Sequence, residues 1–479
     1  MPYQSLGRAV IFALLSGVLM AASASLHPIW WAAWLAPAPV LAAVCGRSLR
    51  AGFALGCLAG LIGSLAFLPY FLGIVGVVPA LIIVVMRAAA QGFAVALAAR
   101  ALFGGVAASR FGRIWPVFVY PLAIAGLDTV NSAVSLHGTV GSLAYSQMEA
   151  IIVLQAASLG GTPLVAFLPS VAGCVLALAM INGKAARAGV AAGLGVLGLV
   201  LGFGLARLAY APANTFVPVA LMASDTGPGI EADHWAETAA RYMPDMTAAA
   251  DVGARIIVLP EKIAALHAPQ QTQARADIAA LARGKSAMVV AGILALDGDS
   301  QANRAIVGRP NGDVQTYDKQ HLVPGFEAQE TPGHTPLAVD APWGRTGIAI
   351  CKDMDFAALG REYARLGVRV MVVPAWDFAG GWGEDGYAHG RMAVLRAVEG
   401  GFTLVRAARQ GRLTVSDRYG RVLAEAPSAD PIGRLLVPAP IPPAGGTVYA
   451  RIGDVFGWAA VALTLLACGL VTRKSRSAV

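Results

Sequence analysis

The segment Thr346-Gly-Ile-Ala-Ile-Cys-Lys-Asp-Met-Asp355 contains a short apolar run, typical of a buried strand, that ends at Cys351. Cys351 is also the only cysteine between Thr215 and Asp454, the one long stretch whose composition suits water. A lone thiol in an oxidising compartment has no disulfide partner, so it is either buried and inert or kept for chemistry. The other cysteines lie in or beside long apolar runs: Cys45, Cys57, Cys174 and Cys468.

The rest of the chain is strongly apolar. Of its 479 residues, 57% are hydrophobic and 13% are charged, which is about half the charged share of a soluble protein. A block of about 20 apolar residues is long enough to span a membrane. We expect about seven spans before the water-compatible stretch and one after it: Val10–Ser25, Pro28–Cys45, Phe53–Gly73, Val77–Leu102, Trp115–Val130, Thr162–Ile181, Ala188–Leu208 and Val455–Thr472.

The charges between these spans give an orientation. The loops Leu26–His27, Gly73–Val77 and Asn131–Gly161 contain no Lys or Arg. Under the positive-inside rule, the alternate, cationic loops are cytoplasmic, so both termini are cytoplasmic and the water-compatible stretch is outside. The formal charge of +8 then reflects cytoplasmic anchoring, and no nucleic-acid partner is implied. The cationic residues are Arg8, Arg47, Arg50, Arg100, Arg110, Arg113, Lys184, Arg187, Arg473, Lys474 and Arg476.

The composition of the chain changes from about Thr215 to Gly446, where short apolar runs alternate with turn residues. Strands that alternate with helices predict a layered α/β domain. We therefore expect a membrane domain over residues 1–212, a soluble domain over 213–446, and a final span with a basic tail over 447–479. The Pro-rich run Pro438–Pro443 is predicted to link the soluble domain to that span. The expected strands are Phe216–Met222, Arg255–Leu259, Ala287–Ile293, Thr346–Ile350 and Val368–Val373, and the expected helices are Glu231–Asp251 and Gln270–Gly284.

Three ionisable residues lie just after these strands or in the chain between them. Glu261 ends the run Ile256-Ile-Val-Leu-Pro260, Cys351 ends the run described above, and Lys319 lies between them in the chain. Reacting groups in α/β folds gather at strand ends. A thiol needs a base to form thiolate, and acyl transfer needs a positive charge where the oxyanion forms. Glu261, Lys319 and Cys351 supply a base, a cation and a nucleophile.

In this order the three residues resemble the Glu–Lys–Cys triad of the nitrilase (carbon–nitrogen hydrolase) superfamily. Over nearly its whole length the chain is similar to one branch of it, the apolipoprotein N-acyltransferases. This resemblance implies an α-helical membrane bundle plus an α/β nitrilase-like α-β-β-α sandwich domain. It also implies the inner membrane of a bacterium, with the sandwich domain in the periplasm. The matching segments are Thr139–Gln147, Tyr317–Glu327 and His389–Glu399.

The resemblance implies a ping-pong reaction on Cys351. Glu261 would be the general base, and Lys319 would stabilise the oxyanion together with the backbone N–H of Lys352. A membrane phospholipid would donate its acyl chain to the thiol, and the α-amine of a diacylglyceryl-cysteine on an apolipoprotein would accept it. Glu327 would be a second carboxylate that supports the lysine. No metal or other cofactor is implied, and we expect a monomer.

Four further residues are candidates with two interpretations each. Lys352 and Asp353 replace the Tyr and Glu that usually follow the family cysteine, which places them near the substrate or leaves them without a function. Trp235 resembles a tryptophan near the acyl site, or it packs in the core. Arg87 lies inside an apolar run and either meets a lipid phosphate or snorkels.

The sequence is also compatible with two other functions. The first is a membrane-tethered amidase or hydrolase that passes the acyl group to water, which the residues after Cys351 favour. The second is a non-catalytic lipid-binding homologue, which the complete set of Glu261, Lys319 and Cys351 disfavours.

Overall fold

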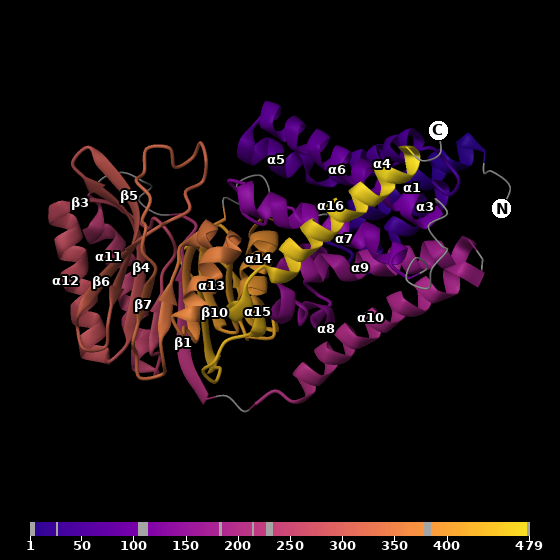
Figure 1. Cartoon of the computed structure of the whole chain (residues 1–479). Helices are drawn as coiled ribbons and strands as arrows, with labels where there is room; N and C mark the ends of the chain where they lie inside the picture. Colours follow the sequence, from indigo (N-terminus) through magenta and orange to yellow (C-terminus); the bar gives the residue numbers. More distant parts are fainter. Residues whose placement is uncertain are drawn as a thin grey trace. The chain divides into compact units, whose positions relative to one another are not determined.

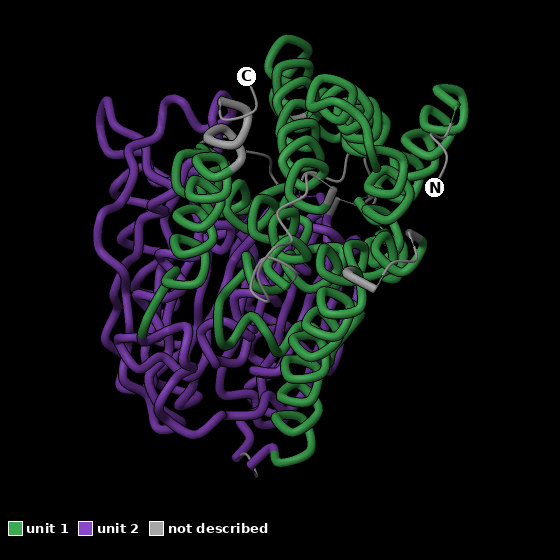
Figure 2. Tube along the Cα trace, turned by 45° about the vertical axis from the view of Figure 1, so that its right-hand side comes forward, with its two compact units in different colours: residues 1–210, 452–479 green, residues 211–451 purple. Residues whose placement is uncertain are grey.

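The computed structural model describes residues 5–24, 27–103, 114–181, 184–212, 215–226, 233–377 and 385–476. The chain divides into two compact units, which Figure 2 colours separately. We call residues 1–210 and 452–479 the helical unit, and residues 211–451 the sheet unit. Each is described by itself.

The helical unit is built from apolar helices. Six helical stretches of the described chain are long and apolar enough to cross a membrane: Leu6–Ser23, Leu49–Gly73, Val77–Leu102, Pro116–Val134, Ala157–Met180 and Ala186–Ala209. The helices are α1 (Leu6–Ser23), α2 (Ala32–Leu35), α3 (Pro37–Ala43), α4 (Leu49–Ser64), α5 (Leu68–Val75), α6 (Val77–Phe103), α7 (Pro116–Val134), α8 (Ile151–Leu154), α9 (Ala157–Ile181), α10 (Lys184–Ala209) and α16 (Val455–Arg476), with the 3₁₀ helices η1 (Leu65–Phe67) and η3 (Leu143–Gln147).

Two of the expected spans differ from the six long helices. The second, Pro28–Cys45, has helical structure only over Ala32–Ala43, and the last has a shorter apolar stretch, Val455–Leu470. Prolines explain the first difference, because Pro37 has no N–H to donate and begins a new helix, α3, directly after α2.

The sheet unit contains two sheets that face each other, with helices outside them (Figure 1). One sheet has the order β13-β1-β2-β4-β5-β6, with β3 beside β4, and the other has the order β12-β11-β10-β9-β8-β7. The strands are β1 (Thr215–Ala223), β2 (Ile256–Val258), β3 (Ala265–His267), β4 (Met288–Asp297), β5 (Ser300–Gly308), β6 (Val314–Asp318), β7 (Leu337–Val339), β8 (Thr346–Ile348), β9 (Val370–Trp376), β10 (Thr403–Arg409), β11 (Arg412–Ser416), β12 (Val422–Pro427) and β13 (Gly433–Ile441). The helices are α11 (Trp235–Asp251), α12 (Ala268–Lys285), α13 (Ala357–Arg365), α14 (Asp385–Gly400) and α15 (Val448–Ile452), with the 3₁₀ helix η4 (Cys351–Asp355).

Alternation along the strands builds two cores. In β1, Val219 and Leu221 join a buried cluster with residues of the opposite sheet such as Val372. Ala220 and Met222, which point to the other face, join a second cluster with residues of α11 and α12. Successive side chains of a strand face opposite sides, so one strand serves both layers. This arrangement is the α-β-β-α sandwich that the family resemblance implies.

The five predicted strands and two predicted helices are present, with ends that differ by a few residues. The helix α11 continues through Pro244. The predicted Pro-rich link is wrong, because Pro438 and Pro440 lie inside β13, which pairs antiparallel with β1. Since β13 is an edge strand of its sheet, a proline N is tolerated there without the loss of a ladder hydrogen bond.

Candidate functional site

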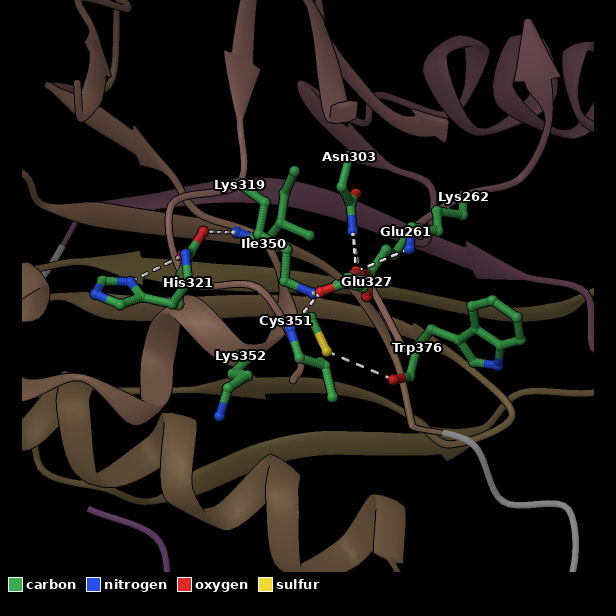
Figure 3. Close-up of polar contacts among 12 residues, drawn as sticks. Glu261, Lys262, Asn303, Lys319, His321, Glu327, Ile350, Cys351, Lys352 and Trp376 are labelled. Atoms are coloured by element: carbon green, nitrogen blue, oxygen red, sulfur yellow. Dashed lines mark hydrogen bonds and ion pairs between the residues drawn. The ribbon is translucent and has the colours of Figure 1, made fainter. Parts of the chain in front are cut away.

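Cys351 lies where β8 gives way to η4, and its side chain is 3% exposed. Its backbone has a positive φ of 47°, which is unusual for a residue other than glycine and costs about 1–2 kcal/mol. The thiol Sγ is 3.4 Å from the carbonyl oxygen of Trp376, to which it donates (Figure 3). The surrounding structure therefore holds the sulfur in a strained and enclosed position.

Glu261 and Lys319 meet beside this thiol. Glu261 follows β2, and Lys319 follows β6, so both side chains come from strand ends of the same sheet. The distance from Lys319 Nζ to Glu261 Oε1 is 2.9 Å, and Lys319 Nζ is also 2.9 Å from Glu327 Oε2. The three charged side chains are at most 3% exposed. Figure 3 shows them grouped with Cys351, so the structure brings together the predicted base, cation, nucleophile and supporting carboxylate.

The charges fix the resting protonation of the site. Burial opposes the charge on Lys319, but the negative charge of Glu261 and other neighbours raises the Lys319 pKa well above its usual value. Burial raises the pKa of the Cys351 thiol, Glu261 raises it further, and Lys319 opposes both. Burial also works against ionisation of Glu327, yet Lys319 and Lys262 lower its pKa to about 2. At neutral pH the site thus holds a charged lysine, an ionised Glu327 and a neutral thiol.

Two contributors to this site carry no motif in the sequence. Asn303, in the middle of β5, donates its Nδ2 to Glu261 Oε1 at 2.5 Å and to Glu327 Oε1 at 2.8 Å. Lys262 Nζ lies 2.8 Å from Glu327 Oε1 and 2.6 Å from Glu330 Oε1. Asn303 is wholly buried, but β5 also contains Ser300, Gln301 and Arg304, so its sequence does not single Asn303 out.

Asp353 is a connecting residue inside the protein. Its carboxylate is wholly buried and accepts hydrogen bonds from both chain segments that flank the site. Oδ2 accepts from Tyr317 Oη at 2.7 Å and from the N–H of Ile350 at 3.0 Å. Oδ1 accepts from the N–H of Gln320 at 3.2 Å and of His321 at 2.9 Å. The carboxylate therefore ties the loop after Lys319 to the segment that carries Cys351.

Lys352 points inward as well. Its side chain is 6% exposed, and its Nζ lies 3.9 Å from Asp355 Oδ2 and 5.4 Å from the ring centre of Phe356. Burial lowers the pKa of Lys352, and Asp355 partly offsets this. A buried ammonium of this kind is held by the protein and does not point into solvent.

The two remaining predicted residues lie elsewhere. Trp235 packs in the core cluster between β1 and the helices, which is not the cluster of Cys351, and its Nε1 donates to Asp277 Oδ2 at 2.8 Å. Arg87 belongs to α6 of the helical unit, where its Nη1 donates to the carbonyl of Gly141 at 2.8 Å. Within the residues that the structure describes, no group of three His, Cys, Asp or Glu side chains could hold a metal ion.

Comparisons with known proteins agree with this architecture. Residues 16–175 match the family described as apolipoprotein N-acyltransferase N-terminal domain, and residues 219–453 match carbon-nitrogen hydrolase. An apolipoprotein N-acyltransferase of Geobacter metallireducens is 30% identical over 98% of this chain and 96% of its own length. Another, of Gloeobacter violaceus, is 27% identical over 76% of this chain and 75% of its own.

Among solved structures, an amidase from Nesterenkonia sp. has a TM-score of 0.41 and 21% identity over 48% of this chain and 93% of its own. The full-length relative from Geobacter metallireducens is similar to this chain over the helical unit and the sheet unit alike. The chain belongs to the apolipoprotein N-acyltransferase family.

Proposed function

We propose that this protein transfers a fatty acyl chain from a membrane phospholipid to the α-amine of the N-terminal diacylglyceryl-cysteine of apolipoproteins, with Cys351 as the acyl carrier. This would be the last step of lipoprotein maturation. The observation that carries the proposal is the buried contact between Lys319 and Glu261 beside a lone thiol, in a chain related to acyltransferases over nearly its whole length.

In the first half-reaction, Glu261 takes the thiol proton of Cys351, and the sulfur attacks the ester carbonyl carbon of the phospholipid. Glu261 Oε2 is buried and has no hydrogen-bond partner among the residues described, so it is available for that proton. Lys319 Nζ and the backbone N–H of Lys352 stabilise the oxyanion. When the C–O bond breaks, Glu261 returns the proton to the leaving oxygen, lysophospholipid departs, and a thioester remains on the sulfur.

In the second half-reaction, the acceptor amine attacks the thioester carbonyl. Glu261 takes a proton from the amine nitrogen as the C–N bond forms, and the C–S bond breaks. The proton then passes to the Cys351 sulfur, and the free thiol is restored. Lys319 serves both oxyanions, while Glu327, which is ionised at neutral pH, keeps Lys319 charged and in place.

The placement in the cell belongs to the same proposal. The alternating cationic loops support an inner-membrane protein of a bacterium, with both termini in the cytoplasm and residues 213–446 in the periplasm. A phospholipid donor and a lipid-modified acceptor are both found at such a surface.

One assay tests the function. Purified protein is mixed with phospholipid that is radiolabelled in its acyl chain and with a synthetic diacylated lipopeptide, and labelled triacylated product is measured. The Cys351→Ala variant is the matched control and should form none. Labelled free fatty acid without triacylated product would instead support the hydrolase interpretation, and no turnover of the lipid would support a non-catalytic homologue.

A further inference from the structure

Two chain segments hold the Cys351 sulfur. The first is η4, which begins at Cys351 and ends at Asp355. The second is the end of β9, where the Trp376 carbonyl accepts the thiol hydrogen bond at 3.4 Å. Since the φ of Cys351 is left-handed, the thiol stays in place only if both segments are held firmly.

One side chain of α14 contacts both segments. His389 Nδ1 is 2.9 Å from Asp377 Oδ1, and Asp377 directly follows Trp376. His389 Nε2 is 3.3 Å from Asp355 Oδ1, at the end of η4. The side chains of the two aspartates are at most 5% exposed, and that of His389 is 13% exposed. The imidazole therefore lies between the two segments as a buried bridge.

Each ring nitrogen faces a carboxylate oxygen, which can only accept, so a proton on both nitrogens suits both contacts. Arg406 Nη2, which lies 3.2 Å from His389 Nδ1, opposes the positive charge of the ring. Other charged groups surround the bridge. Arg406 of β10 donates to Asp377 Oδ2 at 2.9 Å, and Lys352 of η4 lies 3.9 Å from Asp355 Oδ2. On α14 itself, Arg396 pairs with Glu399 at 2.7 Å and acts on Asp355 electrostatically.

We propose that His389 is a positioning residue for the Cys351 thiol, because its imidazolium clamps η4 and the end of β9 together on either side of the sulfur. It touches no substrate and takes no proton in the reaction. The consequence for turnover rests on the proposed function, whereas the clamp itself does not.

The neighbours of His389 favour the charged form of its ring. Burial disfavours the imidazolium, but Asp355 and Asp377 prevail and raise the pKa of His389 to about 10. The clamp is therefore closed throughout the physiological range and loosens only as the pH rises toward that value.

The test compares full-length wild type with His389→Gln, which keeps similar volume but places a neutral acceptor against one carboxylate. Hydrogen exchange by mass spectrometry is read separately for residues 350–356, 370–377 and 385–400. Faster exchange in both of the first two segments is expected. A surface pair of the same kind, His267 and Asp233 at 2.9 Å, offers the control variant His267→Gln, which should change neither segment.

Turnover adds a second readout. A misplaced thiol should lower kcat for triacylated product by about a hundredfold, with KM within a factor of two, because substrate binding is untouched. Exchange that rises in 385–400 alone, or a kcat equal to that of wild type, would overturn the proposal. If wild type itself makes no triacylated product, the proposed function fails, while the exchange data still decide whether the clamp exists.

A further measurement avoids dependence on how the variant folds. In wild-type protein with ¹³C-labelled histidine, the His389 ring should titrate well above pH 8. Asp355→Asn, which removes one of the two carboxylates, should move the His389 titration down. A His389 ring that titrates near 6.5 in wild type would contradict the bridge.

Discussion

The carboxylate of Asp353 offers a sharp test of how the site is held. The change Asp353→Asn keeps the shape of the side chain but replaces one accepting oxygen with an NH₂ group. Whichever way the amide turns, at least one backbone N–H loses its acceptor: either that of Ile350, while the Tyr317 hydroxyl turns to accept from the amide, or those of Gln320 and His321. These are hydrogen bonds to a charged group in a wholly buried place.

The expected size of the effect follows from these contacts. A hydrogen bond to a charged group contributes about 1.5–3 kcal/mol, so the loss of one destabilises the local structure by at least about 1.5–3 kcal/mol. Because about 1.4 kcal/mol corresponds to a tenfold change, amide exchange at Ile350, or at Gln320 and His321, should become at least about tenfold faster. Acyl transfer should fall as well, since one affected loop carries Lys319 and the other carries Cys351.

The assay is hydrogen exchange of full-length protein in detergent, with peptides that cover residues 317–322 and 348–353. The control is Asp340→Asn, an exposed aspartate that pairs with Arg345, for which no change is expected in either peptide. Exchange at the wild-type rate in both peptides of Asp353→Asn would refute the reasoning. It would mean that the carboxylate is not the connection between the two loops.

Further predictions address the reaction, the pH response and the topology. Cys351→Ala and Cys351→Ser should abolish acyl transfer without unfolding the protein, and wild type given phospholipid but no acceptor should show, by intact-mass spectrometry, one hydroxylamine-sensitive acyl group that both variants lack. The low pKa of Glu327, about 2 against 4.5 unperturbed, stabilises the fold fully above the unperturbed value, and this contribution is lost as the pH falls toward 2. Melting temperatures of wild type and Glu327→Gln should therefore converge as the pH falls below about 4.5, and a constant difference would contradict this. A reporter that is active only outside the cytoplasm should work when fused after Pro212 and fail after Arg473, and the reverse would overturn the orientation.

The local sequence sufficed to predict the layered fold and the residues at strand ends. Strands such as β4 and β9 are apolar runs bounded by turn residues, and Glu261 and Cys351 follow such runs directly. Asn303 could not be found this way, because its role depends on Glu261 and Glu327, which are distant in sequence and meet only in the folded structure. The Pro-rich run was misread for a related reason, since whether a strand lies at a sheet edge is a property of the whole topology.

The pairing of β13 with β1 has a consequence for the path of the chain. The first and last strands of the sheet unit, β1 and β13, are hydrogen-bonded neighbours, and Thr215 is paired with Ile441. Thr215 and Ile441 are thus about 5 Å apart, as paired antiparallel residues are, although the unit continues through α15 before it ends. A domain whose ends meet can be spliced into a loop of a host protein without forcing the host's neighbouring segments apart. In this protein the pairing of β1 with β13 closes the sheet at the strands where the chain enters it and leaves it.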